Sequence, residues 1–163
     1  MSFTIGDKIA HPLHGAGIID HIEKRRIDGR DCEYFVLRMP AGDIMVMVPV
    51  ENCEAAGVRA VMSPEAMEKL LSEIPDAFLS MTSNWNKRYR ENMDYIKSGD
   101  LLKVAAVIKG LMDRDAQKTL STQERKMMNS ARQLIESEMI LSMNIPAEQA
   151  GIILDEALSV RRG

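Results

Sequence analysis

The sequence predicts an α+β fold in which a small antiparallel β-barrel is followed by a compact α-helical bundle. Two observations lead to this prediction. Up to about residue 62, short runs of β-branched and aromatic residues alternate with turns rich in glycine and proline, as in small barrels. From Ser63 onward the apolar residues recur at helical spacing instead. We therefore expect two domains, residues 1–62 and residues 63–163.

The strands of the first domain are expected between strong turn signals. Asp28-Gly29 predicts a two-residue hairpin, because a type I′ turn needs a positive φ angle at both central residues. A second turn is expected over residues 40–43, before a run that alternates along residues 44–49. Residues 59–61 predict a short final strand.

The second domain is expected to hold four or five short helices, whose starts are marked by capping residues. Ser63 precedes Pro64, and proline suits the first position of a helix. Ser121 and Glu124 predict a capping box, in which each side chain satisfies the free backbone N–H of the other residue. Further helix starts are expected at Asp100 and Pro146. The residues expected to face the helical core are Met67, Leu70, Leu71, Ile74, Leu101, Val104, Ala105, Ile108, Leu111, Met112, Met128, Ala131, Leu134, Ile135, Met139, Ala150, Ile153, Leu154, Ala157 and Leu158.

One further helix is expected from the only tryptophan of the chain to Lys97. Ser83 or Asn84 can cap its start, because their side-chain oxygens accept from the free N–H groups of the first turn. Gly99 can end it, since glycine tolerates the left-handed conformation that often follows a helix. Trp85 would then lie in the first helical turn, close to solvent.

The surroundings of Trp85 allow two interpretations. Lys87, Arg88 and Arg90 lie within one and a half turns of it, and cations beside an aromatic ring can bind nucleic acid through phosphate pairing and base stacking. Trp85, Tyr89 and Ile96 also recur at helical spacing, as in a stripe that faces a core. Spacing alone favours the core interpretation.

The charge distribution favours contact with an anionic partner. Residues 83–132 contain eleven Lys and Arg against six Asp and Glu, a net charge of +5. Because the whole chain has a net charge of −3, the remaining residues carry −8. A basic segment in an acidic protein suggests a local anionic partner, although mixed charge is also typical of a solvated helix face.

Patterns typical of catalytic, metal and membrane sites are absent from the sequence. The three histidines and two cysteines have no metal-site spacing, and we find neither a phosphate-binding loop nor a nucleophile elbow. We therefore expect a binding protein that is not an enzyme and needs no cofactor or metal. No apolar run is long enough for a membrane span and no signal peptide is recognised, so we expect a cytoplasmic protein. Two cysteines are too few for a disulfide framework, so we expect them to be reduced. We also expect the protein to be a monomer in solution.

A second candidate surface lies in the first domain. Residues 23–27 include Arg25 and Arg26 and precede the expected hairpin. These charges can protect a sheet edge from aggregation, or they can set the register of a partner strand that adds to that edge. In the nearby alternating run, the inward face should hold Ile44, Val46 and Val48. Met45 and Met47 lie on the other face, where methionine can adapt to a partner or fill a gap in a core.

A series of motifs runs in order through nearly the whole chain. They are Phe3-x-x-Gly6-Asp7, Pro12-x-His14-Gly15, Tyr34-x-Val36-Leu37, Gly42-Asp43, Val46-x-Val48-Pro49, Glu51-Asn52, Gly57-Val58-Arg59, Asn84-Trp85-x-x-Arg88-Tyr89, Ser98-Gly99-Asp100 and Leu120-Ser121-x-x-Glu124. Together they resemble the CarD family of bacterial transcription regulators. The resemblance implies a Tudor-like first domain, shared with transcription-repair coupling factors, that binds the β subunit of RNA polymerase. It also implies a helical domain that contacts promoter DNA at the upstream edge of the transcription bubble.

The resemblance also implies roles for single residues. A tryptophan matching Trp85 wedges into the minor groove and helps to stabilise the open complex. Positions matching Arg90 and Arg125 contact the DNA backbone, and a position matching Arg25 contacts polymerase. The full expected sets are Trp85, Lys87, Arg88, Arg90 and Arg125 for DNA, and Arg25, Arg26 and Met47 for polymerase. Well-known family members have a basic residue where this chain has Met47, which weakens the charge part of that contact.

The resulting hypothesis is a non-enzymatic regulator that bridges polymerase and promoter DNA. We expect it to have little sequence specificity for DNA and to associate with the nucleoid through its binding to polymerase. The alternative is a Tudor-like protein–protein adaptor without DNA contact. The basic excess over residues 83–132 argues against that alternative.

Overall fold

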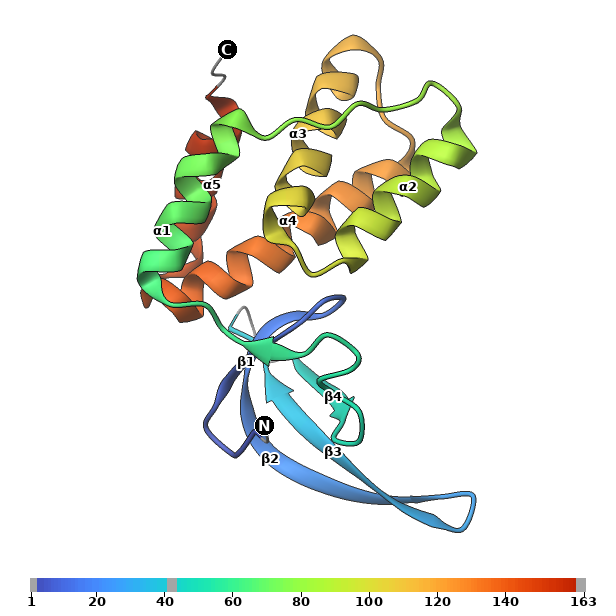
Figure 1. Cartoon of the computed structure of the whole chain (residues 1–163), viewed down its shortest axis with the longest axis vertical. Coiled ribbons are helices and arrows are strands. Elements are labelled where there is room, and N and C mark those ends of the chain that lie inside the picture. Colours follow the sequence, from blue (N-terminus) through green and yellow to red (C-terminus); the bar gives the residue numbers. More distant parts are fainter. Residues whose placement is uncertain (1–2, 41–43, 161–163) are drawn as a thin grey trace.

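The computed structural model describes residues 3–40 and 44–160. Within these residues the chain forms a five-stranded antiparallel sheet, five α-helices and one short 3-10 helix. The sheet forms one end of the molecule and the helices form the other (Figure 1). The predicted α+β class is confirmed, and the sheet is open rather than closed into a full barrel.

The strands follow the expected turns. They are β1 (Lys8–His11), β2 (Gly15–Ile27), β3 (Arg30–Arg38), β4 (Met45–Pro49) and β5 (Arg59–Ala60), arranged in the order β4-β3-β2-β1-β5. Asp28 and Gly29 have φ angles of 51° and 76°, which confirms the hairpin turn between β2 and β3. The turn expected over residues 40–43 falls largely outside the described residues.

The inner face of the sheet forms its own small core. Phe3 packs edge-on against Phe35, with ring centroids 6.5 Å apart, and Cys53 and Val58 close the side of this core. The other buried members are Ile9, Ile19, Leu37, Met39 and Val48. The expectation that Ile44 would share the inward face is wrong: it precedes β4 and is 60% exposed.

The helices begin where the capping residues predict. They are α1 (Pro64–Glu73), the 3-10 helix η1 (Ile74–Asp76), α2 (Trp85–Lys97), α3 (Leu101–Gln117), α4 (Thr122–Met143) and α5 (Ala147–Ser159). Ser63, Asn84, Asp100 and Ser121 each accept a backbone N–H of the first turn through a side-chain oxygen. Most of the predicted core residues are buried, Met139 of α4 among them, but near the start of α4 the buried methionine is Met127, and the predicted Met128 is only partly buried.

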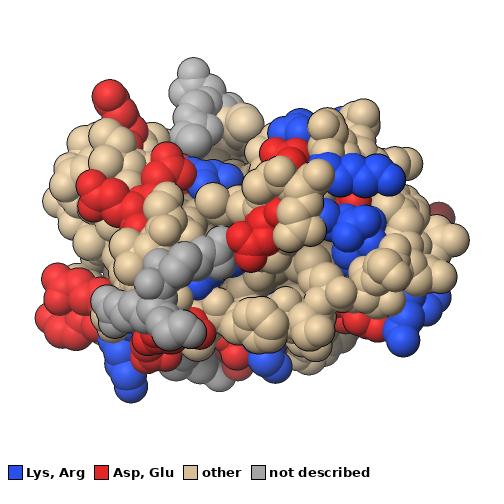
Figure 2. Space-filling model, turned by 90° about the horizontal axis from the view of Figure 1, so that it is seen from above, with Lys and Arg blue, Asp and Glu red and all other residues tan. Residues whose placement is uncertain are grey.

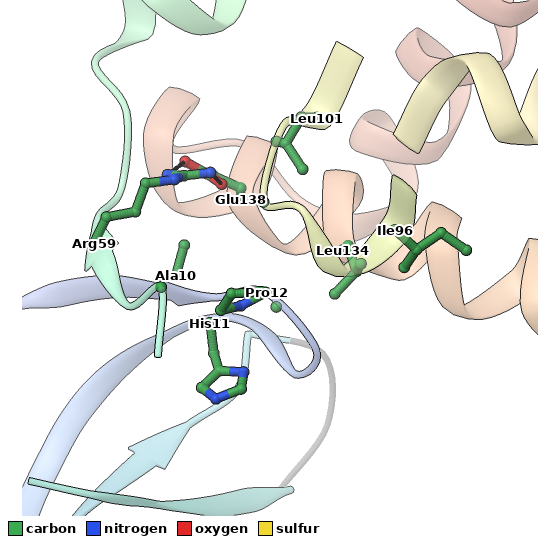
Figure 3. A pocket seen from close by; sticks show the side chains of 11 residues that line it. Ala10, His11, Pro12, Arg59, Ile96, Leu101, Leu134 and Glu138 are labelled. Carbon is green, nitrogen blue, oxygen red and sulfur yellow. Dashed lines mark hydrogen bonds and ion pairs between the residues drawn. The ribbon is translucent and has the colours of Figure 1, made fainter. Parts of the chain in front are cut away.

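Helix α4 carries the contact between the sheet and the helices (Figure 3). Glu138 is 1% exposed, and its carboxylate accepts hydrogen bonds from both terminal nitrogens of Arg59, at 2.6 and 2.8 Å. The backbone N–H of Met62 also donates to it, at 2.9 Å. Glu138 therefore ties both β5 and the connection to α1 to the C-terminal part of α4.

Neighbouring residues of α4 bind the first two strands. The backbone N–H of Ala16 donates to Ser137 Oγ at 2.9 Å, and Lys8 Nζ donates to the carbonyl of Leu141 at 3.1 Å. Gly15 has a φ angle of 89°, and a Cβ at this position would lie 2.7 Å from Ser137 Oγ. Glycine is therefore required there, because both the left-handed backbone and the close approach exclude a side chain.

We expect Glu138→Ala to lower the free energy of unfolding by about 2 kcal/mol, because Arg59 and the Met62 N–H lose a charged acceptor. Glu136→Ala, two residues away on the partly exposed side of α4, is the matched control and should change it by less than about 0.5 kcal/mol. Urea unfolding followed by circular dichroism measures both variants. Equal effects would contradict the structural role of Glu138.

Candidate nucleic-acid interface

Trp85 is the first residue of α2 and is partly exposed. The backbone N–H of Lys87 donates to Asn84 Oδ1 at 3.0 Å, which fixes the first turn of the helix. The indole N–H donates to Ser121 Oγ at 3.3 Å, and the indole stacks on Tyr89 with ring centroids 5.2 Å apart. Tyr89 packs in turn against the helical core. Trp85 therefore stands at the boundary between core and solvent.

The prediction that Arg88 contacts DNA is wrong. Its side chain is 2% exposed, and Nε and Nη2 donate to the two carboxylate oxygens of Glu124, at 2.7 and 3.1 Å. Its third nitrogen, Nη1, donates to the carbonyls of Thr82 and Ser83. A guanidinium that is buried and bonded in this way cannot reach a phosphate. Residue 88 lies almost one helical turn after Trp85, on the side that faces α4.

The capping box expected at Ser121 is formed only in part. Ser121 Oγ accepts from the backbone N–H of Glu124 at 3.2 Å, as predicted. The carboxylate of Glu124 does not return to cap Ser121, because both of its oxygens accept from Arg88. Glu124 is 2% exposed, and a buried carboxylate without a cation costs more free energy than a helix start without a second capping bond.

The other expected DNA contacts lie on the surface. Arg90 is exposed, and Lys87 is exposed and pairs loosely with Glu91 at 3.9 Å. Each residue of an α-helix advances by about 100°, so both lie more than about 130° around α2 from Trp85. Arg125 is half-exposed and pairs with Asp115 at 3.1 Å. The structure therefore does not bring Trp85, Arg90 and Lys87 onto one face of α2.

A hollow of about 360 Å³ lies beside Trp85. It is lined by Ser83, Trp85, Arg88, Arg114, Lys118, Thr119, Ser121 and Glu124. Arg114 and Lys118 form no ion pair with any residue in the described part of the chain, so they are the cations available to an anion here. Neither residue was predicted from the sequence, although their spacing of four residues just before Ser121 places them at one end of α3.

The surface charge is divided between two sides of the helical end. Seen from above, Lys and Arg gather mainly on the α2 side, and Asp and Glu lie mainly on the side of α1 and α5 (Figure 2). Helices α1 and α5 together contain six Asp and Glu and one Lys. The hollow beside Trp85 therefore belongs to the basic side, and the acidic helices face elsewhere.

The candidate polymerase contacts lie in two parts of the sheet. Arg25 and Arg26 lie near the tip of the β2–β3 hairpin, where they pair with Glu23 at 2.7 Å and Asp31 at 3.9 Å. Met47 lies on the edge strand β4, opposite Val36. Arg25 is opposite Cys32, four residues from Val36 along β3, so Arg25 and Met47 are separated by about 14 Å along the sheet. Only a partner that extends along the sheet can contact both.

Comparisons with known proteins identify the family of the chain. The family described as CarD-like/TRCF RID domain matches residues 3–62, and the family described as CarD, C-terminal domain matches residues 65–155. A relative from Bacillus subtilis (strain 168), named "Putative transcription factor YdeB", is 31% identical over 147 residues, which is 90% of this chain and 96% of the relative. The two matched domains and this relative define a protein of the transcription-regulator class. The chain belongs to the CarD family.

Residues 3–40 and 44–160 contain no candidate membrane span and no candidate metal site. No helix among them is both long and apolar enough to cross a membrane. Their His, Cys, Asp and Glu side chains form no group of three that could hold a metal ion.

We expect Arg88→Ala to lower the free energy of unfolding by about 3–5 kcal/mol, because it leaves the buried carboxylate of Glu124 without its cation. Arg90→Ala removes the same kind of side chain from an exposed position of the same helix and should change it by less than about 0.5 kcal/mol. Urea unfolding of the two variants measures the difference. An Arg88→Ala protein as stable as Arg90→Ala would show that the buried pair contributes little.

Proposed function

We propose that the chain is a non-enzymatic transcription regulator that binds the β subunit of RNA polymerase through residues 1–62 and contacts promoter DNA through residues 63–163. By holding the upstream edge of the transcription bubble it stabilises the open complex. One observation carries the DNA half of this proposal: Trp85 is partly exposed beside a hollow lined by Arg114 and Lys118, two cations that form no ion pair within residues 3–40 and 44–160.

The DNA contact follows from the chemistry of that surface. Cations position a protein on phosphates without reading the base sequence, and an apolar ring inserted at a base step unstacks it. Unstacking is least costly where the duplex has already begun to melt, so a wedge favours the bubble edge over intact duplex. Arg114 and Lys118 provide charge beside Trp85, whereas Arg90 and Arg125 offer exposed charge to the DNA backbone outside the hollow. Arg88 has no part in this contact.

The polymerase contact follows from the shape of the sheet. An edge strand such as β4 has a row of backbone groups that a strand of another protein can pair with. Met47 offers an adaptable apolar contact on this strand, while Arg25 and Arg26 add charge at the hairpin. The family match over residues 3–62 supports an interaction with polymerase for this part of the chain. A regulator of this kind acts where polymerase and the chromosome are, in the cytoplasm.

Attachment to polymerase makes a weak DNA contact sufficient. Contacts made mostly to phosphates are sensitive to salt and give low affinity when the protein acts alone. Tethering raises the effective concentration of the wedge at the promoter. The contacts of Glu138, Ser137 and Leu141 with the strands hold the helical part in one orientation relative to the sheet. That orientation decides whether the sheet and Trp85 can bind at the same time.

Trp85→Ala should shorten the lifetime of the open complex by about tenfold, equivalent to about 1.4 kcal/mol, while polymerase binding stays unchanged. The lifetime is measured from the decay of competitor-resistant complexes with and without the protein. Phe78→Ala is the matched control, because Phe78 is an aromatic residue of the same domain that is 85% exposed and lies outside the hollow. An unchanged lifetime with Trp85→Ala would favour the adaptor alternative without DNA contact.

Charge reversals should separate the two surfaces. Arg114→Glu should weaken the promoter effect and lower the slope of its salt dependence by about one, since one phosphate contact is lost, but it should leave polymerase binding intact. Arg25→Glu should weaken polymerase binding, measured in a pull-down with the isolated β lobe, and should leave the DNA-contacting surface intact. Lys69→Glu on the acidic side is the control for both measurements. If Arg114→Glu matched the parent over the whole salt series, its charge would serve only solvation.

A further inference from the structure

We infer that Arg88, Glu124 and Ser121 form a positioning unit that holds the indole of Trp85 in one orientation before any ligand arrives. None of the three needs to touch DNA for this role. The inference rests on the proposed function, because it explains how the wedge is presented. Folding alone does not require the buried charges of Arg88 and Glu124, because an apolar pair of similar volume can pack as well. The inference gives these two charges a functional role.

The guanidinium of Arg88 connects three separate segments. It binds the carboxylate of Glu124 on α4 through Nε and Nη2. Through Nη1 it binds the carbonyls of Thr82 and Ser83, the last residues before the cap of α2. The entry to α2, the first turns of α2 and the start of α4 are therefore fixed by one side chain. A lysine cannot replace it fully, because its single ammonium group lacks the planar fork that serves both groups of acceptors.

Ser121 transfers this constraint to the ring. Its hydroxyl oxygen accepts from the backbone N–H of Glu124 and also from the indole N–H of Trp85. Ser121 and Glu124 both belong to the start of α4, so the acceptor of the indole and the partner of Arg88 move as one body. The polar edge of the indole is held by Ser121 and one of its faces lies on Tyr89. The rest of the ring borders the hollow.

A ring held in this way is ready to act as a wedge. Ordering a flexible side chain at an interface costs free energy, and order that exists beforehand removes that cost from binding. The unit therefore acts on the DNA contact alone. Binding to polymerase, which uses the sheet, should not depend on it.

Ser121→Gly tests the unit, because glycine tolerates the N-cap position but removes the hydroxyl acceptor. Trp85 is the only tryptophan, so acrylamide quenching of intrinsic fluorescence reports on this ring alone. We expect quenching to increase and the open-complex lifetime to fall about fivefold, the factor that corresponds to one hydrogen bond of about 1 kcal/mol, with unchanged polymerase pull-down. Ser121→Thr, which restores a hydroxyl at a tolerated cap, should return both readouts towards the parent values.

Arg88→Lys provides a second variant, and Arg132→Lys on α4 is its control because Arg132 forms a different ion pair, with Asp155 at 2.7 Å. Arg88→Lys should increase quenching and shorten the lifetime, whereas Arg132→Lys should change neither. Unchanged quenching in Ser121→Gly would overturn the inference. So would increased quenching with a parental open-complex lifetime. If Trp85→Ala itself left the lifetime unchanged, the proposed function would fail, but the fluorescence results would still decide whether the unit orients the ring.

Discussion

A carboxylate removed from water must be matched by a cation and by N–H donors, and two such carboxylates on α4 organise this protein. Glu124, near the start of the helix, binds Arg88 of α2. Glu138, fourteen residues later, binds Arg59 of β5. An α-helix rises about 1.5 Å per residue, so the two lie about 21 Å apart and, after nearly four turns, on similar sides of α4. The helix thus joins the element that carries Trp85 to the sheet.

This arrangement links the two proposed binding surfaces through rigid structure. The hydrogen bonds from Arg59, Met62, Ala16 and Lys8 all end on residues 137–141 of α4. A helix bends little over this length, so a movement of the sheet relative to the bundle would have to break several of these bonds together. The orientation of Trp85 relative to the sheet is therefore a property of the fold. The acidic helices α1 and α5 lie away from the basic α2 side (Figure 2).

The errors of the sequence-based site prediction come from contacts between elements that are distant in the sequence. Arg88 lies in a basic cluster, and a cluster in a sequence looks the same whether its members face water or a buried carboxylate. Only contact with α4 shows that Arg88 neutralises Glu124. Arg114 and Lys118 were missed for the opposite reason, because they are close to Trp85 only after α3 has packed beside α2. Glu124 was expected to cap Ser121, but its carboxylate binds Arg88, which is 36 residues away in the sequence.

Local sequence patterns predict the elements: the strands up to residue 60, the hairpin at Asp28-Gly29, the capped helix starts and most of the apolar residues of the cores. Turn geometry, capping and hydrophobic spacing act over a few residues, so they can be recognised without a fold. The tertiary structure decided which charged residues are buried, which cations remain available around Trp85, and how α4 fastens the sheet. These features depend on charged groups and hydrogen-bond donors from different elements. The free energy of such contacts is set by burial and by partners that are distant in the sequence.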